Sequence, residues 1–580
     1  RECRTFMGNV AELLVETLSR AGVKRVLGVV GDSLNGVTDV IRARDDMEWI
    51  GVRHEEVAAF AAGGQAYLTG NLAVCAGSCG PGHVHLINGL YDCARSRVPV
   101  LAIAAHVPST EIGSSYFQET RPELLFRDCS SYCETISHPS QAPRILEIAM
   151  QVAIGQRAVA VVVLPGDVAV MKAETNEPRV VFRRAQPAIR PSDEEITTLA
   201  NALNEAEKVT ILGGAGCAGA HEELIAVAEL LKAPIVHALR GKEFIEYDNP
   251  FDVGMTGLLG FSSGYRAMES CDVLLMLGTD FPYTQFYPKK AWIAQVDTRP
   301  EQLGRRTHLN LGLLGDVKET LRALRPLLRF KEERKHLDDC LKHYRKARET
   351  LDDLAIGKPG HKPIHPQYLT RMVDSLAADD AIFAGDVGTP SIWVARYLTM
   401  NGKRRLLGSW VHGSMAAAVP LAIGAQLACP GRQVITLSGD GGLTMLMGDL
   451  LSLVQHKLPV KMVVYNNSSL AFVELEMKAG GVLPYGTDLV NPNLAQVAEA
   501  MGIRGYRVED PVDVEPALKE AFAHNGPALV DVVVNRQELS IPPSITLQQA
   551  AGFNLYMLKA ILSGRADEIL DLAKTNFLGW

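Results

Sequence analysis

Short apolar runs alternate with longer amphipathic stretches along almost the entire chain. Runs such as Val26–Val30, Val100–Ala104 and Ala158–Leu164 are short and continuously apolar, as parallel strands buried on both faces are. The stretches between them, such as Asn9–Ala21, place apolar residues at helical spacing. This alternation predicts an α/β protein of doubly wound parallel sheets. Further strands are expected at Trp49–Val52, Ala73–Ala76, Val209–Leu212, Pro234–Leu239, Val273–Leu277, Ala291–Val296, Ile382–Ala384, Val434–Leu437 and Met462–Tyr465.

Breaks in this alternation divide the chain into domains. A segment with prolines and acidic residues at 188–200 and a Gly/Pro-rich segment at Gly357–Pro363 interrupt it. The length of 580 residues suits roughly three or four domains. We therefore expect three doubly wound parallel-sheet domains followed by a short helical tail, at residues 1–187, 188–340, 341–537 and 538–580.

The tail carries two apolar stripes. Its charged residues balance, so any membrane binding has to rest on buried apolar area. Periodicity alone favours a helix that docks on its own oligomer. The first stripe is Phe553, Met557, Ala560, Ile561 and Leu562, and the second is Ile569, Leu572, Ala573 and Phe577.

Composition narrows the class of protein. An apolar share of 47% and a charged share of 21% are typical of a globular protein. A net charge of −8 without a dense Lys/Arg cluster argues against a nucleic-acid partner. No apolar run is long enough to span a bilayer, and the N-terminus has no signal-peptide core. The ten cysteines lack CxxC spacing, which favours reduced, buried thiols in a cytosolic protein.

The stretch Gln433–Phe472 carries the clearest chemistry. It predicts a strand, the turn Gly439–Gly442 opening a helix, a second strand, and a loop that begins at Asn466-Asn467. Glycines at a helix start let the backbone approach a phosphate, which the free N–H groups and the dipole favour. Asp440 and Asn467 supply two hard oxygens of the kind that Mg²⁺ prefers.

This Gly-Asp-Gly, spacer, Asn-Asn pattern resembles the thiamine diphosphate (ThDP) signature of the superfamily that contains pyruvate oxidases and acetolactate synthases. The alternative is an ordinary βαβ turn that happens to carry an aspartate. The resemblance implies Mg²⁺ ligands at Asp440, Asn467 and Ser469. It implies ThDP contacts at Asp440, Gly441, Gly442, Asn467, Ser468, Ser469, Leu470, Ala471, Phe472 and Val473.

Glu55 follows a predicted strand and opens an Ala/Gly-rich helix, a position where catalytic groups of α/β proteins lie. It resembles the superfamily's activating glutamate, which hydrogen-bonds N1′ of the cofactor's aminopyrimidine. Glu56 is the rival by residue type. A glutamate at a helix start can also serve only to complement the helix dipole.

Other site residues are implied by the same resemblance. The loop 113–119 places Phe117 as an active-site wall and Gln118 as a polar contact; alternatively, Phe117 anchors the loop in the core. Met415 is expected beneath the cofactor, although a buried core methionine is an alternative. The remaining implied residues are Gly413 and Ser414 on the cofactor, Val387 in the apolar wall and Phe472 as a gate over the reaction centre.

The second domain contains GxGxxG at Gly214, Gly216 and Gly219, a weak dinucleotide signal by itself. The next strand ends in Arg240-Gly241-Lys242 without the acid that NAD binding requires, so NAD is not predicted. Later loops resemble the FAD-contacting segments of pyruvate oxidases, and a domain of this kind without flavin is the alternative. The implied FAD contacts are Gly214, Gly216, Thr256, Gly257, Leu258, Leu259, Thr279, Asp280, Phe281, Pro282, Tyr283 and Asp297.

Along nearly the whole chain, from about Gly8 to Trp580, the resemblance is closest to bacterial quinone-dependent pyruvate dehydrogenases, also called pyruvate oxidases. It implies oxidation of pyruvate to acetate and CO₂ with ThDP, Mg²⁺ and FAD, and electron transfer to ubiquinone or menaquinone. It also implies a homotetramer, or at least a dimer with cofactors between subunits. The tail is expected to bind membrane lipid at the cytoplasmic face of the inner membrane. The segments that carry the resemblance are Arg53–Ala62, Cys75–Gly82, Tyr116–Thr120, Gly254–Gly264, Gly439–Asp449 and Ala573–Asn576.

Two other functions stay open at this point. A carboligase of the acetolactate synthase type shares the ThDP and flavin domains, with the flavin as a bystander. A scaffold that has lost its chemistry is less consistent with the intact Glu55, Asp440 and Asn467.

Overall fold

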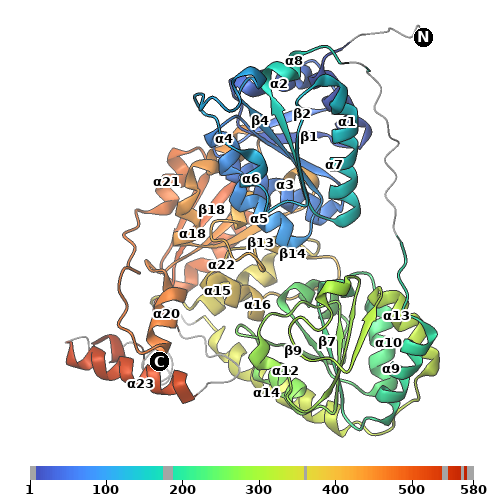
Figure 1. Ribbon diagram of the computed structural model, residues 1–580. Coiled ribbons are helices and arrows are strands. Elements are labelled where there is room, and N and C mark those ends of the chain that lie inside the picture. The colour runs from blue at the N-terminus through green and yellow to red at the C-terminus, as the bar shows by residue number, and fades with distance from the viewer. Residues whose placement is uncertain are drawn as a thin grey trace.

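The computed structural model describes residues 8–173, 175, 187–357, 362–538, 547–563, 567–570 and 572. These residues form three six-stranded parallel sheets, each in its own domain (Figure 1). The prediction of three parallel-sheet α/β domains is thus confirmed. The predicted boundary at residue 340 lies inside one long helix, α14 (Lys335–Leu354), which packs against the second domain.

The first sheet has the strand order β2-β1-β3-β4-β6-β5. Apolar residues of successive strand positions point to opposite faces, and each face has its own core. The strands are β1 (Arg25–Gly28), β2 (Glu48–Gly51), β3 (Ala73–Gly77), β4 (Val100–His106), β5 (Tyr132–Thr135) and β6 (Val159–Pro165). The helices are α1 (Val10–Arg20), α2 (Asn35–Arg42), α3 (Glu55–Thr69), α4 (Pro81–His85), α5 (Ile87–Ser96), α6 (Pro122–Leu125), α7 (Ala142–Gln156) and α8 (Gly166–Val170).

The second sheet has the order β12-β11-β10-β7-β8-β9, the doubly wound order of dinucleotide-binding folds. Its strands are β7 (Val209–Gly213), β8 (Ile235–His237), β9 (Asp252–Met255), β10 (Val273–Leu277), β11 (Trp292–Asp297) and β12 (Leu311–Leu314). Besides α14, its helices are α9 (Asp193–Glu205), α10 (His221–Leu231), α11 (Lys242–Ile245), α12 (Ser262–Glu269) and α13 (Val317–Leu324).

The third sheet, β14-β13-β15-β16-β18-β17, repeats the strand order of the first. Its strands are β13 (Ile382–Gly385), β14 (Arg405–Gly408), β15 (Val434–Gly439), β16 (Lys461–Asn466), β17 (Arg504–Val508) and β18 (Ala528–Val533). Its helices are α15 (Pro366–Leu376), α16 (Thr389–Tyr397), α17 (Ala418–Ala428), α18 (Asp440–Met445), α19 (Leu450–Gln455), α20 (Ala471–Ala479), α21 (Leu494–Ala500) and α22 (Pro511–Ala523).

Two predicted strands are shorter in the structure. The run Val26–Val30 leaves the sheet after Gly28, where its pairing with both neighbouring strands ends. The run Pro234–Leu239 forms only β8, because Leu239–Gly241 turns into a 3₁₀ helix. An apolar run in the sequence predicts a buried strand, but it does not predict at which residue the hydrogen bonding to neighbouring strands ends.

Helices α3 and α17 join the first and third domains along an Ala/Gly seam. A Cβ atom on Gly64 would lie 2.6 Å from the carbonyl oxygen of Leu421, and one on Gly424 would lie 1.9 Å from that of Ala61. The two backbones therefore approach too closely for larger residues at these positions. One apolar core runs through this seam and contains strand residues of both sheets.

Glu243 of the second domain connects all three domains. Its carboxylate accepts hydrogen bonds from the hydroxyl of Tyr67 (2.6 Å), from Nε of Arg405 (2.9 Å) and from the backbone N–H of Leu406 (2.9 Å). Burial of this charge is compensated by an arginine and two further donors.

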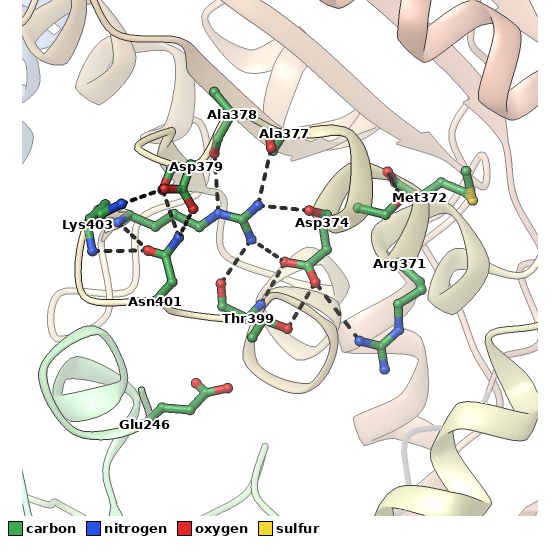
Figure 2. A network of polar contacts seen from close by, with 12 residues as sticks. Glu246, Arg371, Met372, Asp374, Ala377, Ala378, Asp379, Thr399, Asn401 and Lys403 are labelled. Carbon is green, nitrogen blue, oxygen red and sulfur yellow. Dashed lines mark hydrogen bonds and ion pairs between the residues drawn. The ribbon is translucent and has the colours of Figure 1, made fainter. Parts of the chain in front are cut away.

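A second polar cluster braces the third domain (Figure 2). Arg404 donates to Oδ1 of Asp374 (2.8 Å), and the backbone N–H of Thr399 donates to the same atom (2.8 Å). These bonds tie α15 to the segment that enters β14. Glu246 of the second domain lies across the boundary (Figure 2), and burial raises its pKa despite the opposing charge of Lys242.

The C-terminal helix α23 (Leu547–Leu562) packs against α20. Lys559 donates to the carbonyl oxygen of Gly481 (2.8 Å), and Tyr556 and Ala560 are buried. Ile561 and Leu562 are exposed, so the first predicted stripe is not one buried face. Ala573 and Phe577 of the second stripe lie outside the described residues. Every helix that the structure describes is too short or too polar to cross a membrane.

Candidate functional site

Asp440 is the first residue of α18 and lies buried at the carboxyl end of β15. Its Oδ1 accepts the N–H of Gly441 (2.9 Å), and its Oδ2 accepts the N–H of Ser468 (2.7 Å) and the amide of Asn491 (2.7 Å). Burial raises the pKa of this carboxyl group against these three donors. The carboxylate is held rigidly at the N-terminus of a helix, beside backbone N–H groups that suit an anion.

The two consecutive asparagines after β16 have different roles. Asn466 is buried and donates to Oδ1 of Asp531 (2.9 Å), which fixes the loop to β18. Asn467 is only partly buried, lines the large cavity described below, and its Oδ1 accepts the N–H of Ser469 (3.1 Å). Asn467 is therefore the asparagine that could offer an oxygen to a metal in this cavity.

Ser469 lines the same cavity, but its hydroxyl donates to Glu474 (2.7 Å). Burial raises the pKa of Glu474, and the opposing effects of Lys478, Ser469 and Arg536 outweigh it, so the net pKa is lowered. Since the hydroxyl is engaged, the backbone carbonyl of Ser469 is the atom suited to ligate a metal.

The segment of Gly413, Ser414 and Met415 depends on the first domain. Asn88 of α5 donates to the hydroxyl of Ser414 (3.0 Å), and Ser409 donates to the buried Asp92 of α5 (2.7 Å). Burial raises the pKa of Asp92 to about 6. The backbone at Gly413 has a φ of 80°, which glycine adopts without strain.

A cavity of about 1630 Å³ runs from this segment into the second domain. At one end it is lined by Val387, Gly413, Met415, Asp440, Gly441, Gly442, Asn467, Ser469, Leu470, Ala471, Phe472 and Val473. At the other end it is lined by all the residues expected to contact FAD: Gly214, Gly216, Thr256, Gly257, Leu258, Leu259, Thr279, Asp280, Phe281, Pro282, Tyr283 and Asp297.

The second-domain end of the cavity fits a dinucleotide. Cβ atoms on Gly214 and Gly216 would lie 2.6 Å from the backbone of Gly278, so the chain is as close-packed here as a diphosphate-binding loop requires. The hydroxyl of Thr256 is buried without a hydrogen-bond partner among the described residues. Basic residues from the first and second domains also line this end, and burial together with Arg299 lowers the pKa of Arg97 to about 10.

The first-domain edge carries Glu55, which is buried at the N-terminus of α3. His54 caps this helix through a bond from the N–H of Glu56 (3.2 Å), and Nδ1 of His85 lies 3.0 Å from Oε2 of Glu55. A Cβ on Gly82 would lie 3.2 Å from Oε1 of Glu55, so glycine leaves room for the carboxylate. Ligand atoms of His54, Glu55 and His85 all lie within 4.8 Å of one another, which makes this a compact polar group.

Gln118 and Phe117 lie on the same edge. The thiol of Cys79 donates to Oε1 of Gln118 (3.3 Å), and Gly80 faces Gln118 with a φ of 64°. Phe117 is 78% exposed, so it does not anchor its loop in the core of this chain.

The cavity is lined by residues of only one of these two edges. Glu55, Phe117 and Gln118 are absent from the lining of the cavity that contains Asp440 and Asn467. Ser414 and Ser468, which were also predicted to contact the cofactor, lie outside the cavity lining as well. Each instead hydrogen-bonds a neighbour: the backbone N–H of Ser468 donates to Asp440, and the hydroxyl of Ser414 accepts from Asn88.

Sequence reasoning did not find several supporting residues. Asn491 donates a hydrogen bond to Asp440, Glu474 accepts one from Ser469, and Asp92 accepts one from Ser409. Asn491 and Asp92 lie far in sequence from their partners, and no local pattern marks them.

Taken together, the fold and the site are those of an α/β protein whose strands end, at their carboxyl ends, in residues suited to hold a diphosphate cofactor and a divalent metal. Three models of thiamine pyrophosphate (ThDP) enzymes match: the N-terminal TPP binding domain over residues 8–124, the central domain over 196–324 and the C-terminal TPP binding domain over 386–532. The chain belongs to the thiamine pyrophosphate enzyme family.

Relatives match along almost the full length. The putative thiamine pyrophosphate-containing protein YdaP of Bacillus subtilis is 36% identical over 566 residues, 97% of this chain and 98% of that protein. The pyruvate oxidase of Lactiplantibacillus plantarum is 29% identical over 530 residues, covering 90% and 88%. Acetolactate synthase 1 of Zea mays is 29% identical over 558 residues, covering 92% and 86%.

Proposed function

We propose that this enzyme oxidatively decarboxylates pyruvate to acetate and CO₂ with ThDP, Mg²⁺ and FAD, and passes the electrons to ubiquinone or menaquinone. Pyruvate and one water give acetate, CO₂, two protons and two electrons. The observation that carries the proposal is the single cavity that links Asp440 and Asn467 to the dinucleotide-type loops of the second domain. A flavin in those loops would lie next to the thiamine site and could take both electrons.

Each residue has a defined role in this proposal. When bound, ThDP supplies the electron sink that lets CO₂ leave, and FAD accepts two electrons. Asp440, Asn467 and the carbonyl of Ser469 would hold Mg²⁺ beside the diphosphate. Glu55 holds a proton at N1′ of the aminopyrimidine. Met415 would support the cofactor, Gln118 would contact reacting groups, and Val387, Phe117 and Phe472 would exclude water.

The functional unit is proposed to be at least a homodimer, and a homotetramer by resemblance. Glu55 and Asp440 are both needed at one cofactor in this proposal, yet Glu55 is absent from the lining of the cavity that contains Asp440. A second copy would bring its Glu55 edge against the Asp440 edge. The high exposure of Phe117 fits a residue that is covered by such a partner.

The C-terminal helix is proposed to bind membrane lipid, which would place the enzyme at the cytoplasmic face of the inner membrane. Leu555, Leu558, Ile561 and Leu562 of α23 are exposed and offer apolar area without a basic cluster. A chain truncated after Pro543 should no longer float with liposomes of anionic and zwitterionic lipid. If it still floats, the lipid assignment is wrong.

The central test is a visible spectrum of the purified protein under anaerobic conditions. Bound flavin should bleach when pyruvate is added, and a soluble quinone analogue should restore the colour while acetate accumulates. The carboligase alternative is kept because the acetolactate synthase match is as close as that to the pyruvate oxidase. Acetolactate formed without net oxidation would replace the proposal with that alternative.

A further inference from the structure

Helix α16 belongs to the third domain but reaches both ends of the cavity. Residues 387–391, at and just before its N-terminus, line the cavity beside Asp440. Arg396 lies seven residues after Thr389, roughly 10 Å further along the helix axis. In Figure 1, α16 lies at the boundary with the second domain.

The side chain of Arg396 is buried against a loop of the second domain. Its Nε donates to the carbonyl oxygen of Leu259 (3.0 Å), and its Nη2 donates to that of Gly260 (3.2 Å). These are consecutive backbone carbonyls, and the planar guanidinium bonds both at once in a fixed fork, a geometry that an ammonium group does not impose. The bonds therefore fix the direction of the loop as well as its distance from α16.

The loop held in this way is the segment 256–260. Thr256, Gly257, Leu258 and Leu259 line the cavity, and Gly257 has a φ of 97°. Thr256 lines the cavity, and its buried hydroxyl has no hydrogen-bond partner among the described residues. A small apolar cluster of Met255, Phe261 and Ala395 packs the base of the loop against α16.

We propose that Arg396 is a positioning residue that holds the flavin-side loop 256–260 at a fixed distance from the thiamine-side residues on the same helix. The proposal rests on the proposed function, because it assigns the loop to the flavin. A rigid helix that carries both contacts sets the spacing of the two cofactor sites. Loosening the loop is then expected to affect flavin binding and electron transfer while leaving the release of CO₂ intact.

The test compares Arg396→Met, Arg396→Lys and the control Arg432→Met. Arg432 also donates to backbone carbonyls of the third domain, those of Asp380 (2.7 Å) and Lys403 (2.8 Å), but neither of these residues lines the cavity, whereas Leu259 does. FAD affinity is measured by titrating FAD with flavin-free protein and following the quenching of flavin fluorescence. Anaerobic flavin reduction by pyruvate and CO₂ release in the first turnover are measured by rapid mixing and rapid quench.

For Arg396→Met we expect FAD affinity and the flavin reduction rate each to fall by about tenfold, with CO₂ release within about twofold of wild type. Arg396→Lys should give values between those of wild type and Arg396→Met, and Arg432→Met should match wild type in all three measurements. Wild-type affinity and reduction rate in Arg396→Met would overturn the proposal. If that variant does not fold, Arg396→Lys decides, because unchanged flavin behaviour there overturns it as well.

Failure of the proposed function gives a different result. In that case the wild-type protein itself would bind no FAD, or would bind FAD that pyruvate does not reduce. If the wild-type protein binds FAD that pyruvate reduces, and Arg396→Met behaves in the same way, then the role of Arg396 is rejected while the proposed function stands.

Discussion

The first and third domains share one strand order, and in both a glycine-rich turn follows the third strand of the sheet in sequence, β3 or β15. After β15 the turn carries the acid Asp440. After β3 the equivalent turn, Gly80-Pro81-Gly82, carries no acid and instead leaves room for Glu55, which follows β2. In the proposed function, one edge therefore holds a metal and a diphosphate, and the other presents one carboxyl group. The difference teaches that a duplicated topology supplies two distinct halves of a site.

The largest effect is expected for Glu55→Gln, which removes the proton-holding group of the first-domain edge and leaves the Asp440 edge intact. Turnover should fall by at least about 100-fold, as for loss of a general acid–base group. Binding of ThDP and Mg²⁺, measured by calorimetry, should stay near wild type. Activity close to wild type would remove Glu55 from its role.

Hybrid dimers test whether the two edges act across subunits. Chains with Glu55→Gln and with Asp440→Ala should each be inactive. Dimers with one chain of each kind, isolated through two different tags, should regain up to about half of wild-type activity, because one of two sites then has both edges intact. Inactive hybrids would mean that both edges serve one chain.

A matched pair of glycine substitutions should separate the two edges further. In Gly442→Ala the new Cβ would lie 2.1 Å from Oδ2 of Asp386, so the diphosphate turn must shift and ThDP affinity should fall by about tenfold. In Gly82→Ala the new Cβ lies 3.2 Å from Glu55, so kcat should fall by about tenfold with ThDP affinity unchanged. The same kinetic signature in both variants would contradict the division of labour.

The smallest effect is expected at Asp92, which connects the first domain to Ser409 of the third. Its pKa is raised by burial to about 6, so the folded protein binds this proton more tightly than the unfolded chain does. The stability contribution is therefore greatest at low pH and is lost as the pH rises through about 6. Asp92→Asn keeps an acceptor for Ser409 and should stabilise the protein by about 1–3 kcal/mol at pH 8 and by about half as much at pH 5. Thermal melts at both pH values measure this, and a loss of stability at pH 8 would show that the charge is needed.

Much of the fold could be predicted because parallel strands buried on both faces leave continuous apolar runs. Val273–Leu277 matches β10 residue for residue. The ends of β1 and β8 could not be predicted, since they depend on ladder partners elsewhere in the sheet. β14 is short and begins with an arginine, so the sequence has no apolar run that would predict this strand.

The candidate site was predictable where its residues are adjacent in sequence, as in the turn at Asp440. The different roles of Asn466 and Asn467 were not, because only the packing against Asp531 turns one of them inward. Asn491 acts through a contact that spans 51 residues, which no local pattern encodes.

The junction at Glu243 has a consequence for protein engineering. Its carboxylate is shared between Tyr67 of the first domain and Arg405 of the third, so the second domain is not an independent cassette. A chimera that receives this domain from another enzyme, or donates it, has to carry the matching tyrosine and arginine. Without them the graft would bury an uncompensated charge at the point where all three modules meet.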